Sequence, residues 1–147
     1  VIHRKEGEAK TFVVVDAGMN DLIRPTLYDA YHEIRPVRPR EGDPATVDVV
    51  GPVCETGDYL ALARAMPPVE RGDLLAVMTA GAYGAVQSST YNTRTLAAEV
   101  LVDGDRFAVA ERGQEIHQTD RIVRHSAAQV FLVVVVAHAH GEERVAL

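Results

Sequence analysis

The chain has 147 residues, of which 47% are hydrophobic and 24% charged, and this composition is typical of a globular domain with a core of its own. Its formal net charge of -6 argues against a nucleic-acid-binding surface, because phosphate binding depends on lysine and arginine. The longest apolar run, at residues 130–137, is much shorter than the roughly 20 residues that cross a bilayer, so we expect no membrane association.

The single cysteine, Cys54, cannot form an internal disulfide, and this favours a reducing compartment. The charged N-terminal residues lack the apolar segment of a secretory signal, and we therefore expect a cytoplasmic protein. The first residue is Val1 rather than methionine, which suggests a piece of a longer chain.

The first third of the sequence predicts strands with one short helix. Residues 10–18 are rich in valine and predict a strand that ends in a turn. Residues 24–32 predict a short helix, because Pro25 suits a first helical turn. Residues 33–44 contain three prolines and predict an extended segment and a loop, and residues 45–53 predict a further strand.

The middle of the chain predicts a second helix and two more strands. Residues 58–66 have apolar positions at helical spacing, and Asp58 is a suitable N-cap. Residues 73–80 and 82–88 resemble two strands separated by Gly81.

The last third contains the clearest local signal, a hairpin over residues 96–113 with a turn at Asp103-Gly104. The apolar run at 130–137 predicts a buried strand. Many short strands and few helices indicate a mainly β fold, an antiparallel sandwich or barrel with one or two short helices.

Cys54 lies in the segment GPVCETGD at residues 51–58, and two interpretations are open. Free cysteines are usually small buried hydrophobes, and the local composition alone favours that interpretation. The flanking glycines and proline indicate instead a loop, and Glu55 and Asp58 do not suit a core without partners. A thiol beside acids keeps its proton, so a functional Cys54 is a better proton donor than nucleophile.

Two further segments contain candidate binding residues. Arg24 and Tyr28 are four residues apart, so one helical turn places them on one face, where they could hold a carboxylate. The alternative is a surface arginine that covers a half-buried tyrosine. Tyr83 lies between small residues in AGAYGAV, which is compatible either with close approach of a ligand or with a bend around a core tyrosine.

His138 and His140 would share one face of a strand, but the sequence has no third ligand at a recognised spacing. We therefore predict no metal site.

Four stretches, at residues 12–34, 49–58, 76–94 and 109–116, together resemble the diaminopimelate decarboxylases, pyridoxal-phosphate enzymes of the alanine-racemase-like fold type that complete lysine biosynthesis. The resemblance runs from about residue 1 to about residue 123. It implies a decarboxylase C-terminal β-domain at 1–123, followed by an unaligned tail at 124–147.

The resemblance implies a two-domain, homodimeric lyase. In this family a β/α-barrel domain carries the lysine that anchors pyridoxal 5'-phosphate, and the β-domain closes the site. Lys5 and Lys10 lie outside the cofactor motif of the family, so the anchoring lysine is not in this chain and the chain alone should be inactive.

The family's functional residues correspond to five positions here. The resemblance implies that Arg24, Tyr28 and Glu55 bind substrate, that Tyr83 contacts substrate and cofactor, and that Cys54 donates a proton after CO₂ leaves. It also implies that the loop with Cys54 and Glu55 reaches across the dimer interface into the barrel of the partner.

Two alternatives remain. A decarboxylase for arginine, ornithine or a carboxy-polyamine would resemble this chain around Cys54, but its substrate has no distal carboxylate for Arg24. The chain could also be a non-catalytic β-module that acts by association.

Overall fold

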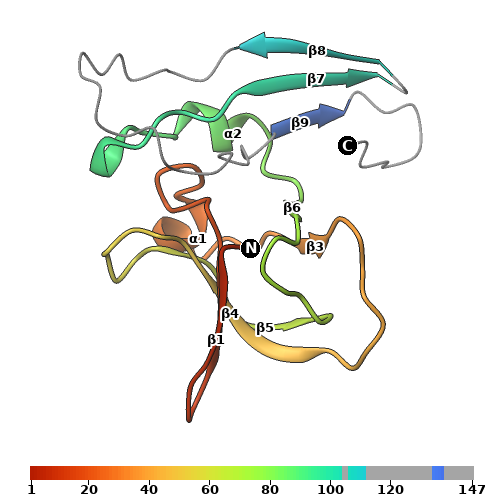
Figure 1. Ribbon diagram of the computed structural model, residues 1–147. Coiled ribbons are helices and arrows are strands. Elements are labelled where there is room, and N and C mark those ends of the chain that lie inside the picture. Colours follow the sequence, from red (N-terminus) through yellow and green to blue (C-terminus); the bar gives the residue numbers. More distant parts are fainter. Residues whose placement is uncertain (104–105, 112–133, 138–147) are drawn as a thin grey trace, which may run out of the picture.

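Strands dominate the computed structural model, which describes residues 1–103, 106–111 and 134–137. The strands are β1 (His3–Glu6), β2 (Thr11–Val14), β3 (Ile34–Pro36), β4 (Ala45–Val50), β5 (Tyr59–Met66), β6 (Leu75–Val77), β7 (Glu99–Asp103), β8 (Arg106–Glu111) and β9 (Val134–Ala137). Two short α-helices, α1 (Arg24–Tyr28) and α2 (Gly81–Val86), and a 3-10 turn at Tyr91–Thr93 complete the described elements (Figure 1). The prediction of a mainly β chain with one or two short helices is confirmed.

The strands form three sheets, with the orders β1-β2-β4-β5, β3-β6 and β8-β7-β9. Most pairs are antiparallel, as expected, but β2 pairs with β4 in parallel and β7 pairs with β9 in parallel. Parallel neighbours need a long connection, and the segment between β2 and β4 contains α1 and β3. Among the described strands no sheet closes on itself, so the arrangement is open rather than a closed barrel.

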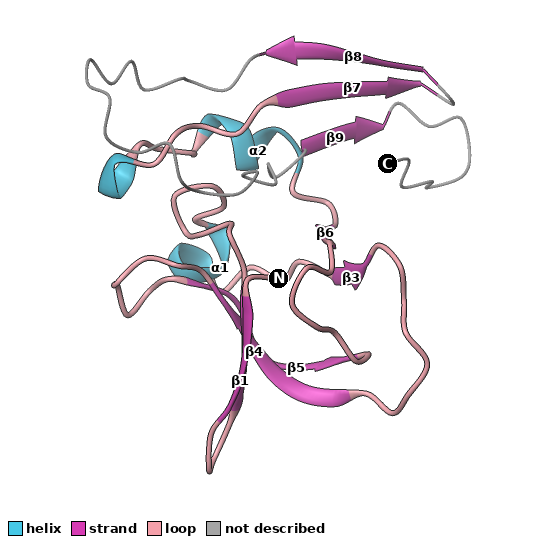
Figure 2. Cartoon of the chain, viewed as in Figure 1, coloured by secondary structure: helices cyan, strands magenta, loops and turns pink. Residues whose placement is uncertain are grey.

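The two helices lie between the four-stranded sheet and the three-stranded sheet (Figure 1). Helix α1 contacts β5, and helix α2 contacts β9. Much of this middle region consists of loops and turns (Figure 2), and the sheets therefore serve as supports for the segments between them.

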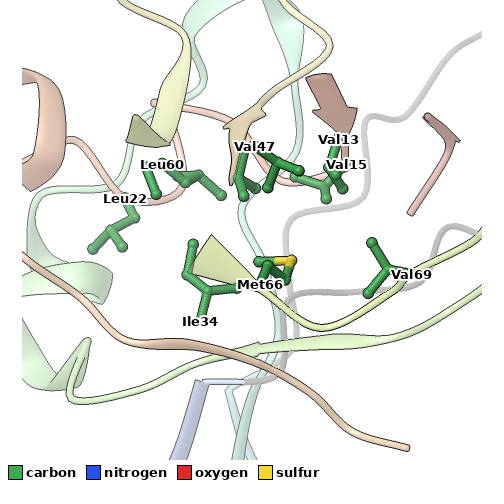
Figure 3. Close-up of a cluster of buried hydrophobic side chains, with 10 residues drawn as sticks. Val13, Val15, Leu22, Ile34, Val47, Leu60, Met66 and Val69 are labelled. Carbon is green, nitrogen blue, oxygen red and sulfur yellow. The ribbon is translucent and has the colours of Figure 1, made fainter. Parts of the chain in front are cut away.

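The core of the molecule is built on the four-stranded sheet (Figure 3). Valines at alternate positions of the central strands point to one side of a strand, and β-branched side chains suit such a pleated surface. The buried apolar residues are Val13, Val15, Leu22, Ile34, Val47, Val49, Leu60, Ala61, Met66 and Val69.

The prediction of a helix at residues 58–66 is wrong, because this segment is β5. Its alanines and leucines have good helix propensity, but pairing along β4 overrides that weak preference. Its apolar spacing looked helical because the strand is irregular. Ala63 has φ +48°, and the register between β4 and β5 shifts on either side of Val49.

A buried carboxylate stabilises this irregular stretch. The Ala63 amide donates to Asp48 Oδ1 at 2.6 Å, and Lys10 Nζ donates to Asp48 Oδ2 at 2.8 Å. Burial acts to raise the pKa of Asp48, but the two hydrogen bonds and the charge of Lys10 outweigh it and leave the pKa below its ordinary value.

The prediction of a strand at residues 82–88 is also wrong, because residues 81–86 form α2. Gly84 is buried, and a Cβ there would lie 3.7 Å from Leu22 Cδ1. The small residues that suggested a strand bend instead let a short helix approach the core closely.

The hairpin expected within residues 96–113 is confirmed by β7 and β8, which pair in antiparallel register. Of the apolar strand expected at 130–137, only residues 134–137 are described, and they form β9, which pairs with residues 99–102 of β7. The expected domain boundary at residue 123 and the two histidines, His138 and His140, lie outside the described residues.

The burial of β5 predicts different losses of stability for substitutions at two of its positions. Met66 is 1% exposed, whereas Leu62 in the same strand is 51% exposed. We expect Met66→Ala to lower the free energy of unfolding by about 2–5 kcal/mol, because it leaves a cavity. The control Leu62→Ala should change it by no more than about 0.5 kcal/mol. Urea denaturation of both variants measures the difference, and equal losses would contradict the described orientation of β5.

Candidate functional site

The buried carboxylate of Asp58 lies at the base of the loop that contains Cys54. Asp58 is 4% exposed. Its Oδ1 accepts a hydrogen bond from the Met19 amide at 2.7 Å, and its Oδ2 accepts one from the Val53 amide at 2.6 Å. The Gly51 amide also donates to the Asp58 carbonyl at 2.9 Å, which closes the loop at its base. One side chain therefore joins the Cys54 loop to the turn that precedes α1.

A glycine makes this arrangement possible. A Cβ on Gly51 would collide with both carboxylate oxygens of Asp58. The segment GPVCETGD therefore needs glycine at its first position because the Asp58 side chain folds back over the backbone there.

The far side of the same loop rests on α1. The Thr26 hydroxyl donates to the Gly57 carbonyl, and a Cβ on Gly57 would lie 2.8 Å from Thr26 Cγ2. The loop is thus held at Gly57 as well as at Val53, while the side chains of Cys54 and Glu55 are exposed.

Helix α1 is short because its ends are fixed by two residues. Pro25 occupies the first turn, where a missing N–H costs nothing. Asp29 ends the helix in a left-handed conformation with φ 53°, which aspartate tolerates better than most residues. Its amide donates back to the Arg24 carbonyl.

Helix α2 places Tyr83 against α1. Arg24 Cζ lies 5.5 Å from the centre of the Tyr83 ring, a cation–π geometry. Gln87 Nε2 lies 3.5 Å from the Tyr28 hydroxyl. Arg24 and Tyr28 therefore both face α2, as their four-residue spacing predicts.

The segment after α2 returns to the turn before α1. The Ser89 amide donates to the Asn20 carbonyl at 2.8 Å. Arg94 Nη2 donates to the Asp16 carbonyl and lies 3.7 Å from Asp21 Oδ2. Residues 18–21 thus connect to the Cys54 loop on one side and to the Tyr83 segment on the other.

Asp21, which lies within this turn, is the second buried carboxylate of the site. Its Oδ2 accepts from the Gly18 amide at 2.8 Å. Burial raises the pKa of Asp21 above its ordinary value, and the charge of Asp58 adds a smaller rise. The Gly18 hydrogen bond, Arg94 and Asn20 oppose this shift without cancelling it.

The comparisons with known proteins identify the domain. The family model described as "Pyridoxal-dependent decarboxylase, C-terminal sheet domain" matches residues 1–81, more than half of the 147 residues. This chain belongs to that family. The matched segment includes the Cys54 loop, α1 and Asp58, but it ends before Tyr83.

Several relatives of this sheet domain are named diaminopimelate decarboxylase. The enzyme of that name from Neisseria meningitidis serogroup A is 54% identical over 114 residues, which are 78% of this chain and 28% of the relative. A solved structure from Aquifex aeolicus has a TM-score of 0.76 and 50% identity, and the match covers 78% of this chain and 28% of that one. The Helicobacter pylori diaminopimelate decarboxylase, solved with L-lysine, has a TM-score of 0.72 and 41% identity over the same shares.

The sheet domain described here thus spans a little over a quarter of the length of these relatives. Within the described residues no helix is long and apolar enough to cross a membrane. The same residues contain no group of three histidine, cysteine, aspartate or glutamate side chains that could hold a metal ion.

The structure brings together three of the five residues expected from sequence. Arg24 lies against Tyr83, and Tyr28 lies beside Gln87 at the end of α2. Cys54 and Glu55 lie on the neighbouring exposed loop. The interpretation of Cys54 as a buried core residue is wrong, because its side chain is exposed.

The residues that hold this site together were not predicted from the sequence. Asp58 was interpreted as a helix N-cap, but no helix follows it, and its carboxylate binds Met19 and Val53 instead. Asp21 and Arg94 were not singled out. The available signal was the occurrence of polar residues, such as Asn20 and Asp21, between a valine-rich strand and a helix.

The residues of this chain fit only part of a pyridoxal-phosphate site. Its two lysines are Lys5, exposed on β1, and Lys10, which pairs with Asp48. Neither lies in the segments that surround Arg24 and Tyr83. Tyr83, 63% exposed beside Arg24, could contact a bound cofactor, but the covalent anchor must come from elsewhere.

The link between Arg94 and Asp21 predicts a pH-dependent effect. A raised folded-state pKa means that the carboxylate form of Asp21 costs stability at neutral pH, and that this cost disappears as pH falls through the raised pKa. Arg94→Met should raise the pKa of Asp21 further, so the variant should lose more stability at pH 7 than at acidic pH. An NMR titration of the Asp21 carboxyl and urea denaturation at both pH values measure the two effects. Arg40→Met, at an exposed ion pair with Asp73, is the control that should leave the titration of Asp21 unchanged.

Proposed function

We propose that this chain is the C-terminal sheet domain of a diaminopimelate decarboxylase, which converts meso-diaminopimelate to L-lysine and CO₂ with pyridoxal phosphate. The proposal is supported by relatives of that name at 50–58% identity over the matched part. A structural neighbour of the same name was solved with L-lysine, the product of this reaction.

The observation that carries the proposal is the contact of Arg24 with the Tyr83 ring, with Tyr28 on the same short helix as Arg24 and beside Gln87. Arg24 is half-buried against the Tyr83 ring, so its guanidinium is partly desolvated and attracts a carboxylate more strongly than a fully hydrated one would. Tyr28 is 58% exposed and Tyr83 is 63% exposed, and their rings and hydroxyls are available to a ligand. A distal carboxylate is the feature that distinguishes diaminopimelate from ornithine-type substrates.

The roles of the loop residues follow from their chemistry. Glu55 is exposed beside Cys54 and would bind the distal ammonium group of the substrate. Pyridoxal phosphate, when bound, supplies a ring that withdraws the electron pair left by departing CO₂. Cys54 Sγ would hold the proton that replaces CO₂ at the α-carbon, because a thiol S–H can act as a general acid.

In this proposal the chain supplies only part of the active site. Residues 1–123 would form the β-domain, a β/α-barrel domain of the same enzyme would bring the anchoring lysine, and the Cys54 loop would reach the barrel of a second subunit in a homodimer. The exposure of Cys54, Glu55 and Tyr83 is compatible with such a shared site. We expect the complete enzyme to work in the cytoplasm.

Complementation tests the proposal directly. The 147-residue chain alone should release no CO₂ from diaminopimelate, because it lacks the anchoring lysine. Mixed with a separately produced β/α-barrel domain of a diaminopimelate decarboxylase, it should restore lysine formation. Lysine formation by the chain alone, or its absence from a mixture in which the two parts bind each other, would contradict the proposal.

Cys54→Ser distinguishes a proton donor from a passive loop residue. In the complemented enzyme we expect turnover to fall by about 10²–10⁴-fold, the usual contribution of a general acid, because a hydroxyl is a far weaker acid than a thiol. The melting temperature should stay close to that of the unchanged protein, since the side chain is exposed. An unchanged turnover would show that Cys54 is not the donor.

Arg24→Ala tests the identity of the substrate. We expect it to reduce kcat/KM for diaminopimelate at least about tenfold more than for lysine, which lacks the distal carboxylate, because a charge-assisted hydrogen bond is lost only with the first. Arg40→Ala, outside the site, is the matched control and should affect both substrates little. Equal losses on the two substrates would favour one of the other decarboxylases of this fold type.

A further inference from the structure

We propose that Asp58 is a positioning residue, whose carboxylate fixes the Cys54 and Glu55 loop relative to the turn that leads into Arg24. The structural part of this inference concerns the chain itself. Its consequence for turnover rests on the proposed function, in which the loop and Arg24 act on one substrate.

The geometry requires both oxygens of one side chain. Asp58 Oδ1 accepts from the Met19 amide at 2.7 Å and Oδ2 accepts from the Val53 amide at 2.6 Å. Met19 lies five residues before Arg24, and Val53 directly precedes Cys54. The carboxylate therefore links the backbone just before Cys54 and Glu55 to the backbone of the turn that leads into Arg24.

The burial of Asp58 makes this connection stiff. The side chain is 4% exposed, and its hydrogen-bond partners in the described chain are backbone amides rather than an arginine or lysine side chain. A buried carboxylate that loses one of two donors becomes costly. The loop and the turn are therefore expected to move together or not at all.

The rest of the loop limits where Cys54 can lie. The Thr26 hydroxyl binds the Gly57 carbonyl, so the loop is attached on both sides of the exposed tip at residues 54–56. With its two ends fixed, only a few residues remain free to move, and the position of Cys54 follows from the position of Val53.

Asp58→Asn in the 147-residue chain tests this role. An amide side chain has one acceptor and one donor group, so it can satisfy Met19 or Val53 but presents N–H to the other. Amide hydrogen exchange at Met19 or Val53, or both, should accelerate by about tenfold or more. A nitroxide on Cys54, the single cysteine of the chain, should give narrower spectral lines because the loop tip moves more.

Asp48→Asn is the matched control. Asp48 is also 4% exposed and also accepts a hydrogen bond from a backbone amide, that of Ala63 at 2.6 Å, but it lies in β4 and bonds to Ala63 and Lys10 rather than to the Cys54 loop. This variant should lose stability while leaving exchange at Val53 and the nitroxide spectrum as in the unchanged chain. Equal effects of the two variants on the loop would overturn the inference, because a general loss of stability would then explain them.

A third measurement keeps the test decisive if Asp58→Asn does not fold. In the unchanged chain the Val53 amide should exchange at least about tenfold more slowly than the adjacent Cys54 amide. Similar exchange at both positions would overturn the inference without any variant. Gly51→Ala, which would push a methyl group into the Asp58 carboxylate, should release the loop in the same way as Asp58→Asn.

Turnover separates this inference from the proposed function. In the complemented enzyme Asp58→Asn should lower kcat more than it raises KM, because the proton donor is displaced while the Arg24 and Tyr83 contacts remain. If the loop is released but kcat is unchanged, the assignment of Cys54 as donor fails while the positioning of the loop by Asp58 stands. If the loop is not released, the positioning role itself is wrong.

Discussion

The candidate site depends on buried carboxylates at one turn. Asp58 on one side and Asp21 within the turn both lie inside the protein, where an ionised group is stable only if hydrogen bonds or charges compensate it. Asp21 accepts a hydrogen bond from the Gly18 amide, and Asp58 accepts one from the Met19 amide. This requirement fixes the backbone of the turn, and the turn in turn connects the Cys54 loop, α1 and the segment that follows α2.

Asp48 and Asp21 are both buried carboxylates that accept backbone hydrogen bonds, but their charged neighbours differ. Asp48 has Lys10 as a partner, and its pKa is lowered despite burial. Burial raises the pKa of Asp21, Arg94 at 3.7 Å opposes this rise only in part, and the nearby Asp58 adds a smaller rise. The sheet carboxylate is thus well compensated, whereas the turn at the site holds negative charge at some cost. Stability costs of this kind are common where polar groups are arranged for function rather than for the core.

Unlike the buried carboxylates, the candidate binding residues Tyr28 and Tyr83 are exposed. The aromatic rings of Tyr28 and Tyr83 lie largely in solvent, although tyrosine rings bury readily when a surface covers them. Their backbone supports are well fixed, since α1 is held by Pro25 and Asp29 and α2 by packing of Gly84 on Leu22. A rigid support that presents uncovered aromatic and charged groups is what the proposed half-site requires, with the remainder supplied by a barrel domain.

The sequence by itself determined the mainly β character, through valine-rich runs that became β2 and β4, and the hairpin of β7 and β8, whose turn composition is local. It also determined the family, because the motifs around Arg24 and Cys54 are read residue by residue. Only the tertiary structure decided that residues 59–66 are a strand and residues 81–86 a helix. In both segments weak local preferences were outweighed by contacts that form only in the folded chain, pairing with β4 for the first and packing near Leu22 for the second. The role of Asp58 was hidden for the same reason, since nothing adjacent to it in sequence reveals that its carboxylate meets Met19, and only the folded chain brings that amide within 2.7 Å.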